Sequence, residues 1–475
     1  MSGASIGIIG GGPGGLITAY YLQKMSSIPC NITIFEASHR LGGKILTPHF
    51  DVVPIRYEAG AAEFYDYSQF DDDPLKELID ELGLSTCPMG GPGVVLQGKL
   101  LANLDDLQTV YGISAVQAVR NFDRTARDLI TPLEFYNADD PEGCIPPSGG
   151  DLQSIVGQMP LSVAQQFVTT LIHSDLATEP TKTSTEYGLQ NYLMNDPAYM
   201  QLYGIVGGNE QLPQELVRRL SATFRMDTRV QEISRSQGKI RVQSSSNQNE
   251  QFDEFDYVVV ALPHNYLGGL KYGERILADA MTRHIAHYHH PAHYLRITIL
   301  FDRPAWRDYC SESYWMLDQF SGCCLYDESS RDASCSYGIL GWLLGGDAAE
   351  THSERTDEEL TSLAMQSLNQ FPWANNLKKL EVRIHRWLGA VNAMPGGKTP
   401  VCQDRKHQPE PEQHPNLFLV GDYLYDSTIN GVVDSAYYVA GWIAAELLQP
   451  APQQPKQTTP TTKPRKETRT YAFRE

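Results

Sequence analysis

The chain has 475 residues, enough for two or three domains, and its composition, 41% hydrophobic and 20% charged, is that of an ordinary globular protein. The formal charge of −19 argues against a nucleic-acid partner, because a phosphate backbone needs a basic surface to bind to. No run reaches the roughly 18 apolar residues of a membrane span, and the start lacks a signal-peptide pattern. The scattered cysteines, without a Cys-x-x-Cys pair, favour reduced thiols and a cytoplasmic location.

The first elements predict a β-α-β unit. The stretch "SIGIIGGGPGGLITAYYLQKM" is typical of a strand, a glycine turn and a helix, and "NITIFEA" is the next strand. The turn has the G-x-G-x-x-G spacing in the structural context that this motif requires. Gly10 permits the tight turn, Gly12 lets a pyrophosphate approach the backbone, and Gly15 lets helix and strand pack closely. Together with Gly14, these residues predict a dinucleotide site.

The second strand ends in an acidic residue, and a basic, glycine-containing loop follows it. The carboxylate of Glu36 can accept hydrogen bonds from ribose hydroxyls and would repel the 2′-phosphate of NADP. In "ASHRLGGKI", which begins at Ala37, Arg40 and Lys44 flank a glycine pair that ends in Gly43. This loop is predicted to face a second phosphate.

The middle of the chain reads as a mostly helical block followed by strands. From 71 to about 199 the pattern is helical, interrupted by Pro/Gly-rich loops such as "NADDPEGCIPPSGGD". The acidic triplet 71–73 is either a solvated turn, with Asp73 as helix cap and Pro74 as first helical residue, or an attraction for a cationic substrate. Beyond 207 we expect a hairpin with its turn at 237–238 and two strands, "FDYVVVALP" and "HYLRITILFD".

The segment "HIAHYHHPAHY" contains five histidines but predicts no metal site. Helical histidines three residues apart can ligate a metal, yet no cysteine or acidic partner accompanies them and a proline breaks the helix. A surface segment leading into the next strand is expected. The histidines concerned are His284, His287, His289, His290 and His293.

The C-terminal part contains a second strand–loop–helix pattern. "LFLVGD" is a strand that breaks at Gly421-Asp422, and "NGVVDSAYYVAGWIAAEL" is a long apolar helix. From 451 to 475 the chain is rich in Pro, Thr, Gln and Lys, carries six Lys/Arg against two Asp/Glu, and is predicted to be a disordered tail.

The stretch from Glu36 to Lys44 resembles the E-x₃-R-x-G-G-[RK] signature of the flavin-containing amine oxidase superfamily. Further blocks in "YEAGAAEF", "GGNEQLPQEL", "TRVQEI", "VVVALP" and the two C-terminal segments resemble that superfamily in the same order. The resemblance implies an α/β fold, in which a Rossmann-like FAD-binding domain (1–70, 200–265 and 391–450) is interleaved with a mixed α+β substrate-binding domain (71–199 and 266–390). It also implies further cofactor-binding residues: Gly60, Ala61, Ala62, Val230, Gly421, Asp422 and Val433.

The residues at the reacting end are implied less directly. Arg296 stands where many members of the superfamily have a lysine near the flavin, and it is a candidate to bind a carboxylate, hold a water or pair with an acid; otherwise it is an ordinary exposed strand residue. Glu63 stands where L-amino-acid oxidases often have an arginine, which favours a cationic substrate unless its side chain points elsewhere. Trp387 and Tyr425 are candidates for the substrate cavity or for core packing. Lys398 replaces the cysteine of covalent members, so non-covalent FAD is predicted.

The function expected from the resemblance is the FAD-dependent oxidation of an amine or amino acid. Hydride transfer to the flavin would give an imine that water hydrolyses, and O₂ would reoxidise the flavin to give hydrogen peroxide. Two alternatives stay open: a flavin desaturase or dehydrogenase acting on C–C bonds, like carotenoid or protoporphyrinogen enzymes, and a non-catalytic FAD-binding protein. The expected partners are the small-molecule substrate and O₂, and a homodimer is left open.

Overall fold

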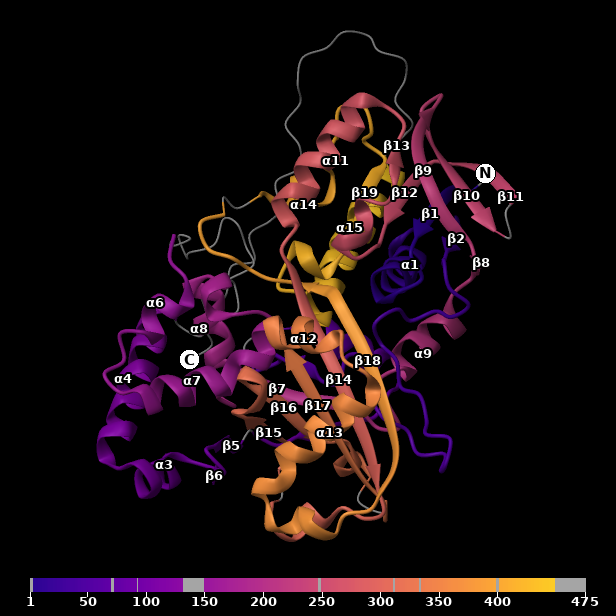
Figure 1. The fold of residues 1–475 in the computed structure, drawn as a ribbon. Helices are drawn as coiled ribbons and strands as arrows, with labels where there is room; N and C mark the ends of the chain where they lie inside the picture. The colour runs from indigo at the N-terminus through magenta and orange to yellow at the C-terminus, as the bar shows by residue number, and fades with distance from the viewer. Residues whose placement is uncertain are drawn as a thin grey trace, which may run out of the picture.

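The computed structural model describes residues 3–69, 72–91, 93–130, 149–246, 249–310, 312–332, 335–398 and 401–448. Most of the predicted loop at 137–151 and the whole predicted tail lie outside these residues. Four sheets and the helices around them form an elongated molecule, in which the N-terminal and C-terminal segments lie together at one end (Figure 1).

A five-stranded parallel sheet forms the centre of that end. Its strand order is β19 (Leu417–Leu419), β12 (Tyr257–Val260), β1 (Ala4–Ile9), β2 (Cys30–Phe35) and β8 (Ala222–Arg225). The strands are short apolar runs, as expected for a parallel sheet covered on both faces. Helix α1 (Pro13–Met25) connects β1 to β2 and packs against α15 (Ile429–Leu448), so the two ends of the chain share one core. The predicted α/β fold is confirmed.

A four-stranded sheet lies beside the parallel one. Its order is β11 (Asn249–Phe255), β10 (Lys239–Ser246), β9 (Arg229–Ser236) and β13 (Lys271–Tyr272). The predicted hairpin joins β9 to β10, and its turn residues Gln237 and Gly238 have φ of 48° and 87°. Positive φ at both positions is the signature of the two-residue hairpin turn whose twist matches the strands. The prediction of this hairpin is confirmed.

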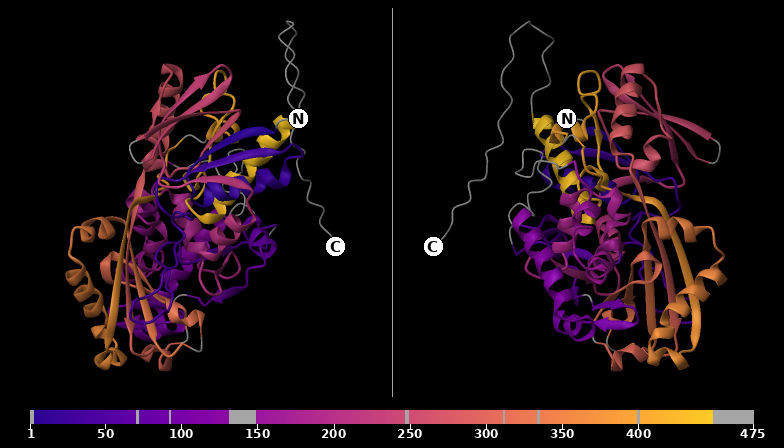
Figure 2. Two further views of the ribbon diagram at one scale, coloured as in Figure 1. Left: turned by 90° about the vertical axis from the view of Figure 1, so that its right-hand side faces the viewer. Right: turned by 60° about the vertical axis from the view of Figure 1, so that its left-hand side comes forward.

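A seven-stranded sheet dominates the other end of the molecule. Its order is β18 (Lys379–Asn392), β14 (Pro291–Phe301), β17 (Gly338–Gly345), β16 (Cys323–Asp327), β15 (Tyr314–Leu317), β5 (Gly93–Leu96) and β6 (Lys99–Leu101). Successive side chains alternate between two cores, because neighbouring strand residues point to opposite faces. Figure 2 shows helices on both sides of this sheet. On one side lie α4 (Ile113–Leu129), α7 (Ser162–Leu176) and α8 (Thr185–Leu193), and on the other α12 (Gly346–Ser353) and α13 (Asp357–Ser367).

The block predicted as helical also contains strands. Besides α2 (Pro74–Glu81), α3 (Leu104–Tyr111) and α6 (Leu152–Val156), it contributes β5 and β6 to the large sheet and β4 (Thr86–Met89) to a small one. Short apolar runs such as "GVVL" carry no periodicity that separates strand from helix, so pairing with neighbouring strands decides their conformation, here with β15 and β6. The Asp73 side chain accepts hydrogen bonds of 3.0 Å from the N–H groups of Leu75 and Lys76, which confirms it as the cap of α2.

The remaining small sheet connects the two ends of the molecule. Its order is β3 (Phe64–Asp66), β7 (Gln201–Ile205) and β4. The other helices are α9 (Gln211–Arg219), α10 (His264–Leu267), α11 (Arg275–Tyr288) and α14 (Gln403–His407). Among the described residues, no helix combines the length and the apolar character needed to cross a membrane. The proposed domain boundaries remain predictions.

Candidate active site

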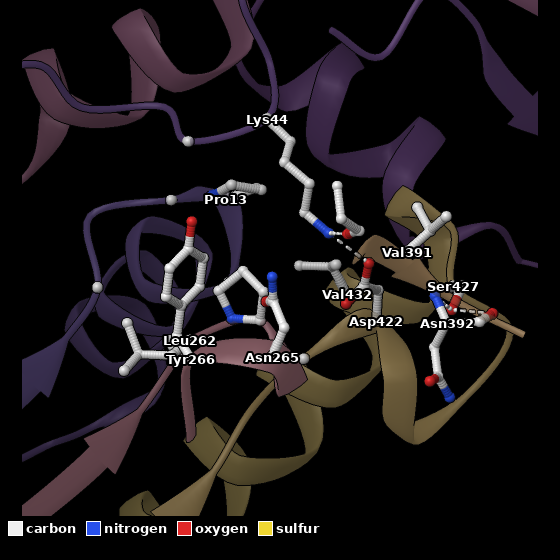
Figure 3. A pocket seen from close by; sticks show the side chains of 18 of the residues that line it. Pro13, Lys44, Leu262, Asn265, Tyr266, Val391, Asn392, Asp422, Ser427 and Val432 are labelled. Atoms are coloured by element: carbon white, nitrogen blue, oxygen red, sulfur yellow. Dashed lines mark hydrogen bonds and ion pairs between the residues drawn. The ribbon is translucent and has the colours of Figure 1, made fainter. Parts of the chain in front are cut away.

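One large cavity of about 920 Å³ runs from the parallel sheet to the large sheet. Segments far apart in the sequence line it, including the glycine turn, the end of β2, the loop before β3, α7, α8, β9, β18 and the start of α15. Figure 3 shows part of this lining, with Pro13, Lys44, Asp422 and Val432 labelled. Most of the predicted site residues are in its lining. These are Gly10, Gly12, Gly14, Glu36, Ala37, Gly43, Lys44, Gly60, Ala61, Ala62, Glu63, Val230, Trp387, Gly421 and Asp422.

The glycine turn has the geometry that its sequence predicts. Gly10 has φ of 113°, and a Cβ on it would lie 2.4 Å from the carbonyl oxygen of Ala261. A Cβ on Gly15 would lie 2.0 Å from the carbonyl oxygen of Gly10, so Gly15 serves the packing of α1 and does not line the cavity. At Gly12 a Cβ would meet only the Cα of Gly43, at 3.7 Å. The open face of the turn is therefore at Gly12, toward the cavity.

Glu36 and Arg40 stabilise the two loops around this turn. One carboxylate oxygen of Glu36 accepts from the N–H of Gly11 at 2.9 Å, and the other accepts from the N–H and hydroxyl of Ser38 at 2.8 and 2.7 Å. The guanidinium of Arg40 donates to the carbonyls of Leu41 and Gly43, and Arg40 is not in the cavity lining. Arg40 thus holds its own loop in place instead of projecting into the space where a phosphate would lie.

Lys44 and Asp422, predicted separately as cofactor-binding residues, form an ion pair in the cavity wall. Their Nζ and Oδ2 atoms are 2.8 Å apart, and the ammonium also donates to the carbonyl of Ala390 (Figure 3). The pair joins the loop after β2 to the turn after β19. It connects the N-terminal and C-terminal halves of the site directly.

At the start of α15, the residue that faces the cavity is Val432 and not the predicted Val433. Val432 is in the cavity lining, whereas Val433 is fully buried in the core between α15 and the parallel sheet. Successive residues of a helix are rotated by about 100°, so a shift of one position exchanges the two faces. Gly421 lies in the turn between β19 and α15, and its N–H donates to the hydroxyl of Ser435 at 3.1 Å.

The loop Gly60–Ala62 is held from behind by a buried polar network. The amide of Asn209 donates to the carbonyl of Ala61 at 2.9 Å, and the guanidinium of Arg331 donates to the carbonyl of Ala62. Arg331 also pairs with Glu58 at 2.7 Å. Burial raises the pKa of Glu58 to about 7 in spite of this partner, because desolvation disfavours its charged form.

Two carboxylates line the cavity at its deep end. Glu63 precedes β3, and Asp175, which the sequence did not indicate, lies near the end of α7. Both side chains are open to the cavity but enclosed by protein otherwise. Burial raises the pKa of Glu63, and burial together with the charge of Glu63 raises the pKa of Asp175 well above its usual range. One oxygen of Glu63 has no hydrogen-bond partner.

Aromatic side chains surround these carboxylates. The polar tips of three of them donate to backbone carbonyls: Tyr294 to Ser174 at 3.0 Å, Tyr187 to Asp426 at 2.9 Å and Trp387 to Ala59 at 2.7 Å. With these tips engaged, the rings present apolar surface to the cavity. Tyr65 and Tyr67 complete this wall. The deep end is therefore an apolar, aromatic space with two acidic groups in it.

Two of the predicted substrate-end residues lie outside the cavity lining. Tyr425 is buried behind the cavity, where its hydroxyl donates to Gln403 at 3.0 Å. Arg296 is fully buried on β14, so the alternative of an ordinary exposed strand residue is wrong. Its guanidinium pairs with Glu328, which agrees with the expectation that it could pair with an acid.

The histidine-rich segment forms the end of α11 and the start of β14. His289 is exposed as predicted, but His284 is buried against Tyr423, with ring centroids 6.0 Å apart, and burial lowers its pKa to about 3. His293 accepts from the N–H of Gly389 at 3.1 Å. No group of three or more His, Cys, Asp or Glu side chains within the described part of the chain is arranged to hold a metal ion.

The residues of the cavity fit a dinucleotide cofactor. The N-terminus of α1 has Gly12 as its cap, without a capping side chain, and it faces the cavity, so its free N–H groups are available to an anion. Gly12 leaves the space of a side chain open there, while the oriented carboxylate of Glu36 stands at the end of the neighbouring strand. These groups would hold a pyrophosphate and a ribose, respectively. Among the described lining residues, none is a cysteine.

The comparison with known proteins defines the class. The model of the family "flavin containing amine oxidoreductase" matches residues 13–444, and the chain belongs to this family. The protein is therefore an FAD-dependent oxidoreductase, as the signature after β2 predicted.

Individual relatives are more distant. The chain is similar to prenylcysteine oxidase 1 of Rattus norvegicus, with 36% identity over 97 residues, which are 20% of this chain and only 18% of that protein. Among solved structures it resembles cyclohexylamine oxidase from Brevibacterium oxydans, with a TM-score of 0.72, 16% identity, and coverage of 94% of this chain and 100% of the other. A putative protoporphyrinogen oxidase from Exiguobacterium has a TM-score of 0.70, 20% identity and the same coverage, 94% and 100%. At these identities the solved structures establish the fold.

Proposed function

We propose that the enzyme oxidises an amine that carries a second positive charge, such as a diamine. The observation that supports this substrate class is the pair of half-buried carboxylates, Glu63 and Asp175, that line the cavity among aromatic side chains. A buried carboxylate without a counter-ion is unfavourable, and an ammonium group of the substrate would supply that counter-ion. The similarity to a cyclohexylamine oxidase supports an amine as the reacting group.

The distribution of basic residues supports the same substrate class. Among the described lining residues, the basic ones are Lys44, Arg229 and Lys271. Lys44 is paired with Asp422, and the other two belong to β9 and β13 of the four-stranded sheet. None of them accompanies Glu63 at the deep end. An α-amino acid or a porphyrinogen, both of which carry carboxylates, would meet like charge there.

In the reaction, bound FAD supplies the acceptor for a hydride from the carbon next to the substrate nitrogen. Glu63 and Asp175 would bind the distal ammonium. The length of the alkyl chain between the two amines would then determine how far the reacting carbon extends toward the flavin. The rings of Tyr65, Tyr294 and Trp387 would exclude water around the alkyl chain. The imine product would be hydrolysed by water, and O₂ would be reduced to hydrogen peroxide. FAD is expected to be bound non-covalently.

The experiment is a peroxide-release assay on the purified yellow protein with 1,4-diaminobutane, butylamine and ornithine. We expect 1,4-diaminobutane to be oxidised with the highest kcat/KM. The variant Glu63→Gln should raise the KM for the diamine by about 10- to 100-fold, since a hydrogen bond to a charged group contributes roughly 1.5–3 kcal/mol, and should change butylamine much less. Oxidation of ornithine in preference to both amines would overturn the proposal. Anaerobic bleaching without peroxide in air would indicate a dehydrogenase.

A further inference from the structure

Glu328, which is not in the cavity lining, pairs with Arg296, one of two buried arginines whose charge acts on Glu63. The other is Arg331, which is already paired with Glu58. Arg296 on β14 points to the same face of the large sheet as Tyr326 on β16, because Leu295 and Ile297 point to the opposite core. Its guanidinium carbon lies 4.9 Å from the ring centroid of Tyr326. One guanidinium nitrogen pairs with Glu328, and the two others have no partner.

Glu63 belongs to the same neighbourhood, since Ala62, the residue before it, and Tyr326 are part of one core cluster. Hydrogen bonding to Tyr326 opposes the effect of burial on the pKa of Glu63. Arg296 and Glu63 also interact electrostatically, since the charge of each stabilises the charged form of the other. An arginine with unused donors and a carboxylate with an unpartnered oxygen thus stand close to one aromatic ring without forming an ion pair.

The backbone provides the space for this arrangement. Gly341 on β17 lies opposite Tyr326, and a Cβ on it would lie 3.2 Å from a carboxylate oxygen of Glu328 and 3.3 Å from a guanidinium nitrogen of Arg296. The second carboxylate oxygen of Glu328 accepts from the backbone N–H of Glu58 at 3.1 Å, which fixes its position. Glu328 is therefore fixed in position as the ion-pair partner of Arg296. The pair occupies space that the side chain of any residue larger than Gly341 would fill.

We propose that Glu328 is a specificity-determining residue, which keeps the charge of Arg296 away from Glu63 and so leaves Glu63 free for the substrate ammonium. The inference rests on the proposed function, since it explains how the deep end stays acidic beside a buried arginine. Without Glu328, the guanidinium would have Glu63 as its nearest available counter-ion, and an arginine–carboxylate pair would displace the substrate ammonium.

The test uses the full-length enzyme with its FAD reduced beforehand by dithionite, so that the amines bind without being oxidised, and calorimetric titration with 1,4-diaminobutane and butylamine under anaerobic conditions. The quantity measured is the ratio of the two dissociation constants, which isolates the second ammonium. For the wild type we expect a preference for the diamine of about 30-fold, equivalent to roughly 2 kcal/mol. The variant Glu328→Gln keeps the shape but removes the charge, and its preference should fall to about threefold or less.

The double variant Arg296→Met/Glu328→Gln is the matched control. It removes both charges, leaves Glu63 without a competitor, and should restore the preference to within about threefold of the wild type. A merely structural role of the pair predicts the reverse order, with the double variant at least as impaired as the single one. If Glu328→Gln does not fold, Glu328→Met provides a second variant that removes the charge at similar size, and the diamine preference should again be lost.

The outcomes separate the inference from the proposed function. A wild type without a preference for the diamine refutes the proposed substrate class, and the inference with it. A wild-type preference that persists unchanged in folded Glu328→Gln or Glu328→Met refutes the inference alone. Failure of the double variant to recover the preference also refutes it.

Discussion

The two ends of the cavity are built in different ways. The cofactor end is made largely of backbone: the glycine turn after β1, the loop after β2 and the turn after β19 present N–H groups and small residues. The substrate end is made of side chains, namely two carboxylates and a ring of aromatic residues from α7, α8, β14, β18 and the loop before β3. A backbone site depends on local conformation, whereas a side-chain site depends on which distant elements pack together.

The largest difference between two variants is expected for alanine substitutions at two glycines of the same turn. Gly15→Ala places a Cβ 2.0 Å from a backbone oxygen, so we expect a lower melting temperature of the apoprotein as well as loss of FAD. Gly12→Ala meets nothing closer than 3.7 Å, so the melting temperature of its apoprotein should stay unchanged. Its flavin content should still fall about tenfold or more, because the new methyl group stands where a pyrophosphate approaches.

The measurements are thermal unfolding of the stripped proteins and their visible spectra after incubation with FAD. Tight FAD binding by Gly12→Ala would show that the open face of the turn is not the phosphate site. The backbone of the glycine turn would then not be what binds the pyrophosphate of the cofactor.

The next largest effect is expected in the pH dependence of the preference for a diamine at the proposed substrate end. The pKa values of Glu63 and Asp175 are raised by burial, so both groups hold their protons, and are neutral, up to higher pH than ordinary carboxyl groups. Selectivity for a second ammonium requires the charged form. It should therefore be lost as the pH falls through the raised pKa values and should rise by up to about tenfold per pH unit as they ionise.

The ratio of kcat/KM for 1,4-diaminobutane to that for butylamine, measured across roughly pH 5 to 9, reports this change, because ionisation of the reacting amine largely cancels in the ratio. Glu63→Gln should flatten the profile. A ratio that does not vary with pH in the wild type would contradict an ionising pair at the deep end.

A smaller effect is expected where the two ends meet. Arg331 bonds both Glu58 and the carbonyl of Ala62, and Lys at this position keeps the charge but cannot make both bonds in the same geometry. We expect Arg331→Lys to lower the free energy of unfolding by roughly 1–3 kcal/mol, the cost of leaving a buried acceptor unpaired. The control is Arg218→Lys, whose side chain is 70% exposed and pairs with Glu215 on the surface.

Urea unfolding of both variants measures this difference. The surface variant should differ from the wild type by less than about 0.5 kcal/mol. Equal stability of both variants would mean that the contact between Arg331 and the Gly60–Ala62 loop contributes nothing to the fold.

The smallest effect is expected at Tyr425. Its hydroxyl bonds Gln403 and lies near His407, outside the cavity lining. Tyr425→Phe should cost about 1 kcal/mol of stability, the usual net value of one hydrogen bond. Its kcat and KM should stay within about twofold of the wild type in the peroxide assay. A large rise in KM would place Tyr425 at the substrate after all.

Much of the fold and of the cofactor end could be predicted from the sequence. The hairpin at 237–238, the cap at Asp73 and the glycine turn each depend on residues a few positions apart, and each was found as predicted. Two details at the cofactor end depend on the folded structure. Val432 lines the cavity in place of Val433 because one residue of helix changes the face, and Arg40 bonds its own loop because its guanidinium reaches the carbonyls beside it.

The proposed substrate end could be derived from the sequence only in part. Asp175 and Tyr294 carry no motif, and they reach the cavity only because α7 and β14 pack around the loop before β3. Whether Arg296 is free or paired depends on Glu328, a residue 32 positions away on another element. No short-range pattern could indicate that this arginine is already paired.

By itself, the sequence determined the family, the cofactor and the parallel sheet, because a glycine turn and its flanking strands adopt one conformation from local sterics and hydrogen bonding. The tertiary structure alone decided the surroundings of the carboxylates in the cavity. Whether such a carboxylate stays free or becomes neutralised depends on which side chains surround it, and here β14, β16 and the turn after β16 bring Arg296, Tyr326 and Glu328 together in the neighbourhood of Glu63.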